Sequence, residues 1–102
     1  MASYSQGDIL AVKQGKNTRH YLVVSNADYQ QVTGNLIVCK INASTGRFFL
    51  QDRLPKGMGT SGNVELANLE VLQLGKRSAL DVVDHLSGDD LERILVCIQS
   101  FF

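Results

Sequence analysis

The chain has 102 residues, of which 44% are hydrophobic and 20% charged, and this composition predicts one globular domain spanning residues 1–102 and excludes a disordered chain. Ten basic and ten acidic side chains give a formal net charge of zero, which excludes proteins that coat long nucleic acids through many phosphates. Any contact with RNA or DNA must therefore rest on a local basic patch. A domain of this size buries only about two-thirds of its unfolded surface, so a dimer would enlarge its core.

Two cysteines, Cys39 and Cys97, lie within apolar runs, and neither has a second Cys or a His nearby at metal-ligand spacing. We expect both thiols to be free and to act as small apolar residues, with no metal and no cofactor. The N-terminus has neither the basic start nor the apolar stretch of a signal peptide. No apolar run approaches the roughly 20 residues of a membrane helix, so a cytoplasmic protein that does not enter the membrane is expected.

The first part of the chain predicts two strands separated by a loop. Residues 9–12 form a short apolar run that follows Gly7-Asp8 and indicates the first strand. Residues 13–20 are polar, basic and contain glycine, which is typical of a loop. Residues 21–24 are aromatic and β-branched and predict the second strand.

A short helix and a central strand are predicted next. Ser25 or Asn26 can cap one turn of helix, which Thr33-Gly34-Asn35 would end. Residues 36–41 are apolar except for Lys40 and predict a strand that is buried on both faces.

The middle of the chain predicts turns, short strands and one long loop. Residues 42–46 indicate a turn and residues 48–50 a fourth strand. Residues 51–62 hold the only proline and three glycines and are expected to be a loop with little regular structure. Residues 64–66 and 69–74 alternate between apolar and polar side chains, which predicts two half-buried antiparallel strands.

The C-terminal segment gives the clearest helix signal. Ser87 can cap a helix whose first turn contains Asp89 and Asp90, where the helix dipole favours acidic groups. Apolar residues then recur at helical spacing, at Leu91, Ile94, Leu95 and Ile98. The predicted fold class is therefore mostly β (α+β), with antiparallel strands, a short helix after strand two and a C-terminal amphipathic helix.

Three motifs occur in an informative order. Gly7-Asp8-Ile9 opens the folded part, residues 19–26 read Arg-His-Tyr-Leu-Val-Val-Ser-Asn, and residues 33–41 lead from the short helix into the central strand. In this order they resemble the MazF/PemK (Kid) family of type II toxin–antitoxin toxins. Members of that family open with Gly-Asp-[Ile/Val] and continue with Arg-Pro-x-Leu-Val-[Leu/Ile]-[Ser/Gln]-[Asn/Pro]. The resemblance, strongest over residues 7–41, implies an SH3-like antiparallel β-barrel.

The resemblance also implies an activity. Family members are typically mRNA interferases, endoribonucleases that cut single-stranded RNA at short sequences without a metal ion. The 2′-hydroxyl of the RNA attacks the adjacent phosphate, so the protein must supply a base and an acid and stabilise charge on the phosphoryl oxygens. In the family, an arginine at the start of strand two does much of this work, and Arg19 falls on that position. Its planar guanidinium can hold two phosphate oxygens at once.

The candidate site departs from the family pattern at two positions. Asn42 stands where the family has a threonine or serine, with Ser44 and Thr45 shortly after it, and His20 replaces the proline that follows the arginine. The loop before Arg19 is also short and lacks the usual acidic residue. The candidate catalytic residues are Arg19, His20, Asn42 and Ser44, and the candidate RNA-binding residues are Lys13, Lys16, Thr45 and Arg47. His85 is expected to be a strand residue held by a neighbour.

Two other functions remain open at this point. The related CcdB fold is not catalytic and inhibits DNA gyrase through its terminal helix, and the apolar end Phe101-Phe102 would suit such a contact. The same end could instead fold onto the barrel. Alternatively, Asn42 could mark a degenerate module that only binds a partner. The partners implied by the resemblance are single-stranded RNA, a cognate antitoxin with a disordered acidic segment, and a second copy of the chain in a homodimer.

Overall fold

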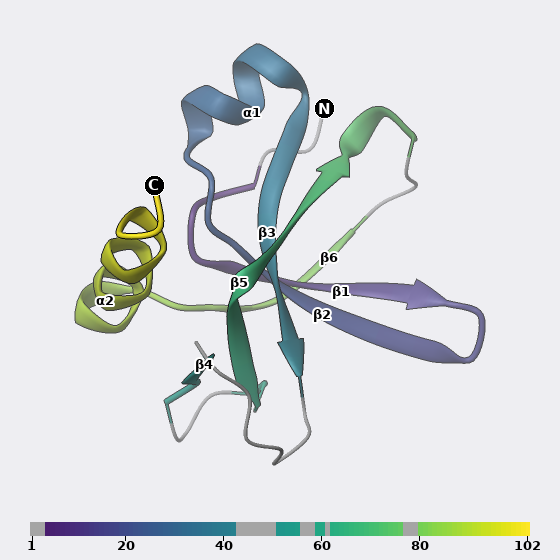
Figure 1. Ribbon diagram of the computed structural model, residues 1–102. Coiled ribbons are helices and arrows are strands. Elements are labelled where there is room, and N and C mark those ends of the chain that lie inside the picture. The colour runs from purple at the N-terminus through teal and green to yellow at the C-terminus, as the bar shows by residue number, and fades with distance from the viewer. Residues whose placement is uncertain (1–3, 43–50, 56–58, 61, 77–79) are drawn as a thin grey trace.

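One antiparallel sheet organises the chain, with the strand order β4-β5-β3-β2-β1-β6. The computed structural model describes residues 4–42, 51–55, 59–60, 62–76 and 80–102. In chain order (Figure 1) the elements are β1 (Asp8–Gln14), β2 (Asn17–Val23), α1 (Ala27–Thr33), β3 (Asn35–Asn42), β4 (Gln51–Arg53), β5 (Asn63–Gln73), the 3-10 turn η1 (Leu74–Lys76), β6 (Asp81–His85) and α2 (Gly88–Gln99). The mostly β antiparallel class and the positions of both helices are confirmed. Within the described residues the sheet is not closed, because β4 and β6 end the strand order without pairing to each other.

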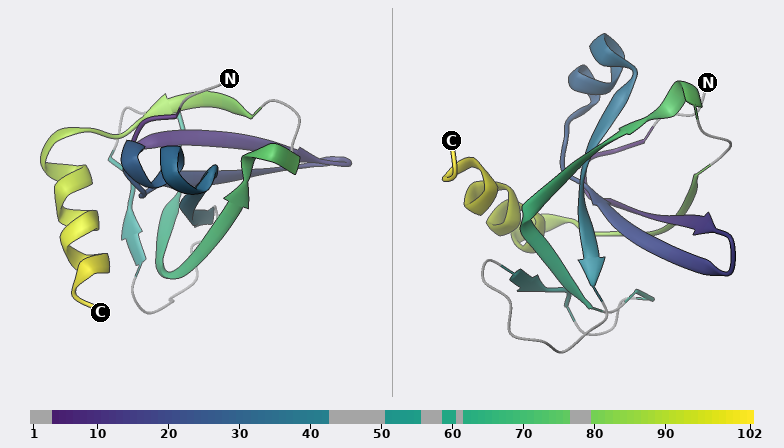
Figure 2. Two further views of the ribbon diagram at one scale, coloured as in Figure 1. Left: turned by 90° about the horizontal axis from the view of Figure 1, so that it is seen from above. Right: turned by 45° about the vertical axis from the view of Figure 1, so that its right-hand side comes forward.

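The predicted loop over residues 13–20 is wrong, because these residues form the ends of a β-hairpin. β1 continues to Gln14 and β2 begins at Asn17, with Val12 opposite Arg19 and Lys13 opposite Thr18. The hairpin extends away from the rest of the sheet, on the opposite side of the molecule from α2 (Figures 1 and 2). Its outer part is solvated on both faces, so polar residues can occupy a paired strand there, and the apolar alternation that marks half-buried strands is missing.

The short helix after strand two is confirmed in detail. The Asn26 side chain accepts a hydrogen bond from the Tyr29 N–H at 2.9 Å, which caps the N-terminus of α1. Gly34 ends the helix in the left-handed conformation, with φ of 72°, and its N–H donates to the Gln30 carbonyl oxygen. None of the residues of α1 is buried, so its caps define it more than its packing does.

Apolar side chains pack on both faces of the central strand, as predicted. The cluster that we call the α2 core lies between the sheet and α2 and consists of Ile9, Leu22, Val24, Cys39, Ile41, Leu54, Val64, Leu66, Leu86, Ile94 and Ile98. A second cluster consists of Tyr4, Leu10, Val12, Tyr21, Val23, Leu36, Val38, Leu72 and Leu80. Successive residues of a strand point to opposite faces, so membership of these clusters tells which way each side chain points.

The region after β3 differs from the prediction in two ways. Residues 51–53, expected in a loop, form β4, which pairs with β5 at Gln51–Glu65 and Arg53–Asn63. The two strands predicted over residues 64–74 are one strand, β5, whose register against β3 shifts between Cys39 and Ile41. A register shift of this kind absorbs extra residues without ending the strand. The predicted turn at 43–46 and strand at 48–50 lie outside the described residues.

The C-terminal helix packs along one side of the sheet (Figure 2). Ile94 and Ile98 are buried in the α2 core, and Leu91 and Leu95 pack against it, as the helical spacing predicted. Ser87 is the N-cap residue, but its hydroxyl makes no capping hydrogen bond. Phe102 is 92% exposed, so the end of the chain does not fold down onto the sheet. Among the described residues, no helix is both long and apolar enough to span a membrane.

The α2 core provides a direct test of how the helix is attached. Ile94 is only 1% exposed, and Ile94→Ala leaves a cavity there, so the free energy of unfolding should fall by about 3 kcal/mol. Val96 on the same helix is 58% exposed, and Val96→Ala should change stability by less than about 0.5 kcal/mol. Urea unfolding followed by circular dichroism measures both, and equal effects would show that α2 does not dock through Ile94.

Candidate functional site

Arg19 points to the face of the sheet opposite the α2 core. It alternates along β2 with His20 and Leu22, and Leu22 lies in that core. Arg19 is exposed, and no hydrogen bond or ion pair joins its side chain to another described residue. Its guanidinium is therefore accessible to an anionic ligand.

Asn42 shares this face and lies at the end of β3. On β3, Lys40 and Asn42 alternate with Cys39 and Ile41, both in the α2 core. Ile41 pairs with His20, so Arg19 and Asn42 are the next residues along the two strands. The two residues therefore lie on one face, each one position beyond the last pair of β2 with β3.

Two residues of β5 join the same face, and sequence reasoning missed both. Asn63 lies opposite Asn42, and Glu65 follows two residues later. Both alternate with Val64 and Leu66, which belong to the α2 core, so both point away from it. We call the set Arg19, Lys40, Asn42, Asn63 and Glu65 the polar face. The signal that could have found it is the Asn-Val-Glu-Leu alternation, which identifies side chains opposite a core but not which strands they meet.

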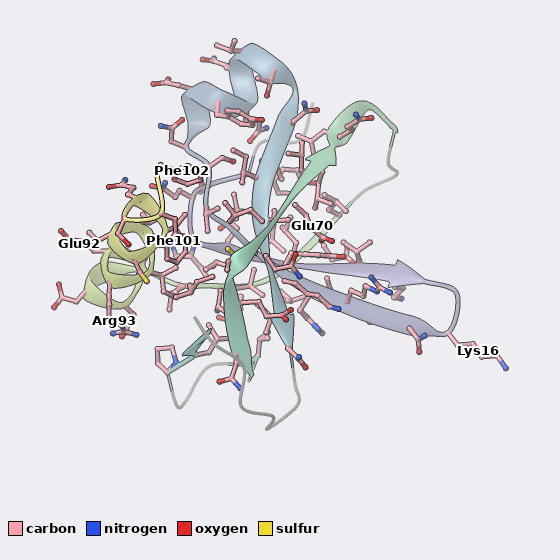
Figure 3. The ribbon with its side chains drawn as sticks, in the orientation of Figure 1. Lys16, Glu70, Glu92, Arg93, Phe101 and Phe102 are labelled. Carbon is pink, nitrogen blue, oxygen red and sulfur yellow. The ribbon has the colours of Figure 1, made fainter. Side chains whose placement is uncertain are left out.

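Other predicted site residues are placed elsewhere. His20 and Lys13 alternate along their strands with residues of the second cluster. Both side chains therefore point to the side of the sheet that carries the α2 core. Lys16 lies in the hairpin turn and extends into solvent (Figure 3). Consequently Arg19 is separated from His20 and Lys13 by the thickness of the sheet. Ser44, Thr45 and Arg47 lie outside the described residues.

Burial controls the electrostatics near the polar face. Burial raises the pKa of the Cys39 thiol to about 12, and the negative charge of Glu65 contributes to the increase. The Glu65 carboxylate is therefore close enough to act on Cys39. Its Oε2 atom is buried and has no hydrogen-bond partner. Among the described residues, no group of three or more His, Cys, Asp or Glu side chains could hold a metal ion.

Comparison with known proteins identifies the architecture. No protein-family model matches the chain, and no curated protein matches it. A solved structure of MazF from Deinococcus radiodurans superposes with a TM-score of 0.80 at 21% identity, covering 99% of this chain and 97% of the other. A chain of the MazE-MazF complex from the same organism gives a TM-score of 0.83 at 22% identity, covering 99% and 96%. The fold is that of MazF. An endoribonuclease bound to its cognate antitoxin, from a mycobacterial species, matches with a TM-score of 0.76 at 15% identity, covering 99% and 93%.

Within this MazF fold, His85 has the neighbour that the sequence led us to expect. Its Nδ1 lies 2.8 Å from Oδ1 of Asp8, which ties the end of β6 to the start of β1. Hydrogen bonds from the backbone N–H groups of His85 and Thr60 lower the pKa of the Asp84 carboxyl. The His85–Asp8 pair lies at the β1–β6 side of the sheet, so β2 and β3 separate it from the polar face residues of β5.

The cysteines of this MazF fold are both free, as predicted, and they differ in accessibility. Cys39 is buried and Cys97 is partly exposed. At pH 8 an alkylating reagent should label Cys97 first and Cys39 at least about 100-fold more slowly, because the buried thiol is almost entirely protonated. Mass spectrometry of digested samples measures this.

The raised pKa of Cys39 also predicts a pH dependence of stability. Above its ordinary pKa of 9.0 the unfolded thiol loses its proton while the folded thiol keeps it, so stability should fall between pH 9 and 12 and be unaffected by this group at lower pH. In Cys39→Ala this part of the decline should be absent. Rapid labelling of Cys39 in the folded protein would contradict both expectations.

Proposed function

We propose that this chain is the toxin of a type II toxin–antitoxin system, a metal-independent endoribonuclease that cuts single-stranded RNA at a short sequence. The observation that carries the proposal is the placement of Arg19 and Asn42 on the same face of a MazF fold, each just beyond the last pair of β2 with β3. The fold alone does not fix a function, so the chemistry of this face has to support it.

The polar face suits attack by a ribose hydroxyl on the adjacent phosphate. Arg19 can donate two parallel hydrogen bonds to the phosphoryl oxygens, and it stabilises the charge that grows on them during attack. The amide of Asn42 can donate a further hydrogen bond to the same phosphate. Lys40 adds positive charge two residues along β3. A neutral chain with such a local patch fits a short RNA segment better than a long duplex.

The direct test is incubation of the purified protein with a long single-stranded RNA in the presence of EDTA. We expect cuts at a small number of defined sites, seen as discrete bands on a denaturing gel. RNA that stays intact, while circular dichroism shows a folded protein, would overturn the proposal. Cleavage that requires added Mg²⁺ would leave the nuclease but contradict the metal-independent chemistry.

The partners follow from the same proposal. We expect a cognate antitoxin that lays an acidic segment over the polar face and folds as it binds. We also expect a homodimer, located in the cytoplasm. A domain of this size gains core by pairing. Several large apolar side chains are exposed and could form the dimer contact, namely Val32, Val71, Val82, Val83, Val96, Phe101 and Phe102. Light scattering at micromolar concentration should give twice the chain mass.

One observation favours a second candidate, a CcdB-like poison of DNA gyrase. Phe101 and Phe102 are exposed at the end of α2, on the side of the molecule away from the β1–β2 hairpin (Figure 3). Exposed aromatic side chains at a chain end are typical contact residues. Inhibition of gyrase supercoiling that persists in Arg19→Ala and disappears in Phe102→Ser would support this candidate over the nuclease.

A further inference from the structure

The polar face contains one buried acceptor that the chain leaves unpaired. The Oε2 atom of Glu65 is buried without a hydrogen-bond partner, and no other described side chain that is not exposed has such an atom. Leaving a buried carboxylate oxygen unpaired is costly, so native structures rarely keep such a group without a role. The missing donor is expected to come from a bound ligand.

Glu65 also fills a chemical gap in the proposed reaction. Attack by the 2′-hydroxyl needs a base, and neither the guanidinium of Arg19 nor the amide of Asn42 can accept that proton. His20 could accept it, but it points to the other face of the sheet. Glu65 supplies a carboxylate on the same face as the phosphate-binding groups.

The sheet places Glu65 within reach of a nucleotide held by Arg19. β2, β3 and β5 are consecutive in the strand order, so where β2 and β5 both pair with β3 their backbones are about 10 Å apart. The two side chains extend from this same face. A ribose with its 3′-phosphate can therefore lie over β3, with the phosphate toward Arg19 and the sugar toward Glu65.

We propose that Glu65 is the general base of the cleavage reaction, an inference that rests on the proposed function. Its carboxylate takes the proton of the 2′-hydroxyl as the 2′-oxygen bonds to phosphorus. The bond from phosphorus to the 5′-oxygen breaks, and that oxygen takes a proton from water. The products are a 2′,3′-cyclic phosphate and a 5′-hydroxyl, and Glu65 then returns its proton to solvent. The Glu65 side chain is partly exposed, so its two oxygens can exchange by rotation about the terminal torsion.

The surroundings of Glu65 define the controls. Glu65 is close enough to the Cys39 thiol to raise its pKa, and it shares the polar face with Lys40 on β3 and Arg19 on β2. Glu70 lies further along β5, opposite Val38, and has the same side chain at a partly exposed position (Figure 3). Glu70→Gln is therefore the matched control for Glu65→Gln.

The test is single-turnover cleavage of a short RNA that carries one mapped site, in EDTA at neutral pH. Glu65→Gln should slow cleavage by at least about 100-fold, while Glu70→Gln should cleave at the rate of the unaltered protein. Glu65→Gln should unfold at the same or a higher urea concentration, because it removes an unpaired buried charge. A merely structural role for Glu65 would instead lower the stability of Glu65→Gln together with its activity.

Two results would overturn the role of Glu65, and they differ in whether the proposed function survives. Normal cleavage by Glu65→Gln, or slow cleavage by a destabilised Glu65→Gln, rejects Glu65 as the base and leaves the nuclease intact. A folded, unaltered protein that leaves the RNA uncut rejects the proposed function and the role of Glu65 with it.

Discussion

Arg19→Ala is expected to lower kcat/KM for RNA cleavage by about 10³-fold, equivalent to about 4 kcal/mol of transition-state stabilisation. The guanidinium is the group of the polar face best suited to hold two phosphoryl oxygens as their charge increases. Because Arg19 is exposed and bonds to no other described residue, its loss should leave the free energy of unfolding almost unchanged. Initial rates with a fluorescent RNA substrate and urea unfolding separate the two effects.

Arg93→Ala is the matched control for the loss of a positive charge. Arg93 lies on α2, pairs with Asp90 at 3.0 Å, and points away from the sheet (Figure 3). An exposed pair of this kind contributes at most about 1 kcal/mol, and the position is remote from the polar face. Equal loss of activity in both variants would indicate a general charge effect and contradict a specific role for Arg19.

Gly7→Ala is expected to lower the free energy of unfolding by about 4 kcal/mol, the sum of backbone strain and overpacking. Gly7 has φ of 98°, which residues with a Cβ rarely adopt. An added Cβ would overlap the Leu86 carbonyl oxygen and lie 2.9 Å from Leu91 Cδ2. The N–H of Leu86 donates to the Gly7 carbonyl oxygen, so this contact joins the start of β1 to the segment before α2.

Gly15→Ala serves as the control for the backbone term alone. Gly15 has φ of 60° in the β1–β2 turn, and nothing lies within 4 Å of the position of an added Cβ. The expected loss is only about 1 kcal/mol. Urea unfolding of both variants measures the difference. Similar losses in the free energy of unfolding would show that the segment before α2 shifts at little cost to accommodate the added methyl group.

The elements that could be predicted from sequence are those with local causes. The caps Asn26 and Gly34 define α1 through hydrogen bonds within a few residues of sequence. The spacing of Ile94 and Ile98 defines the buried side of α2. The missed elements have distant causes: β4 pairs with β5 through backbone groups, which residue type does not reveal, and β5 continues through a register shift that only its neighbour β3 explains.

The candidate site was predictable in part for the same reason. The resemblance identified Arg19 and Asn42, and the register places them on one face, each one residue beyond the last pair of β2 with β3. The candidate catalytic set included both Arg19 and His20, whereas adjacent strand residues point to opposite faces. Glu65 was missed because its burial depends on how β5 lies against the rest of the sheet.

The most direct measurement of the central claim uses an RNA oligonucleotide in which the nucleotide at the mapped cut carries a single 2′-deoxy substitution. If the 2′-hydroxyl is the nucleophile, the substituted RNA should stay intact while the all-ribose RNA is cut to products that end in a 2′,3′-cyclic phosphate and a 5′-hydroxyl. Mass spectrometry of the products identifies both ends. Cleavage of the substituted RNA at the same position and rate would contradict the mechanism and the roles of Arg19 and Glu65 derived from it.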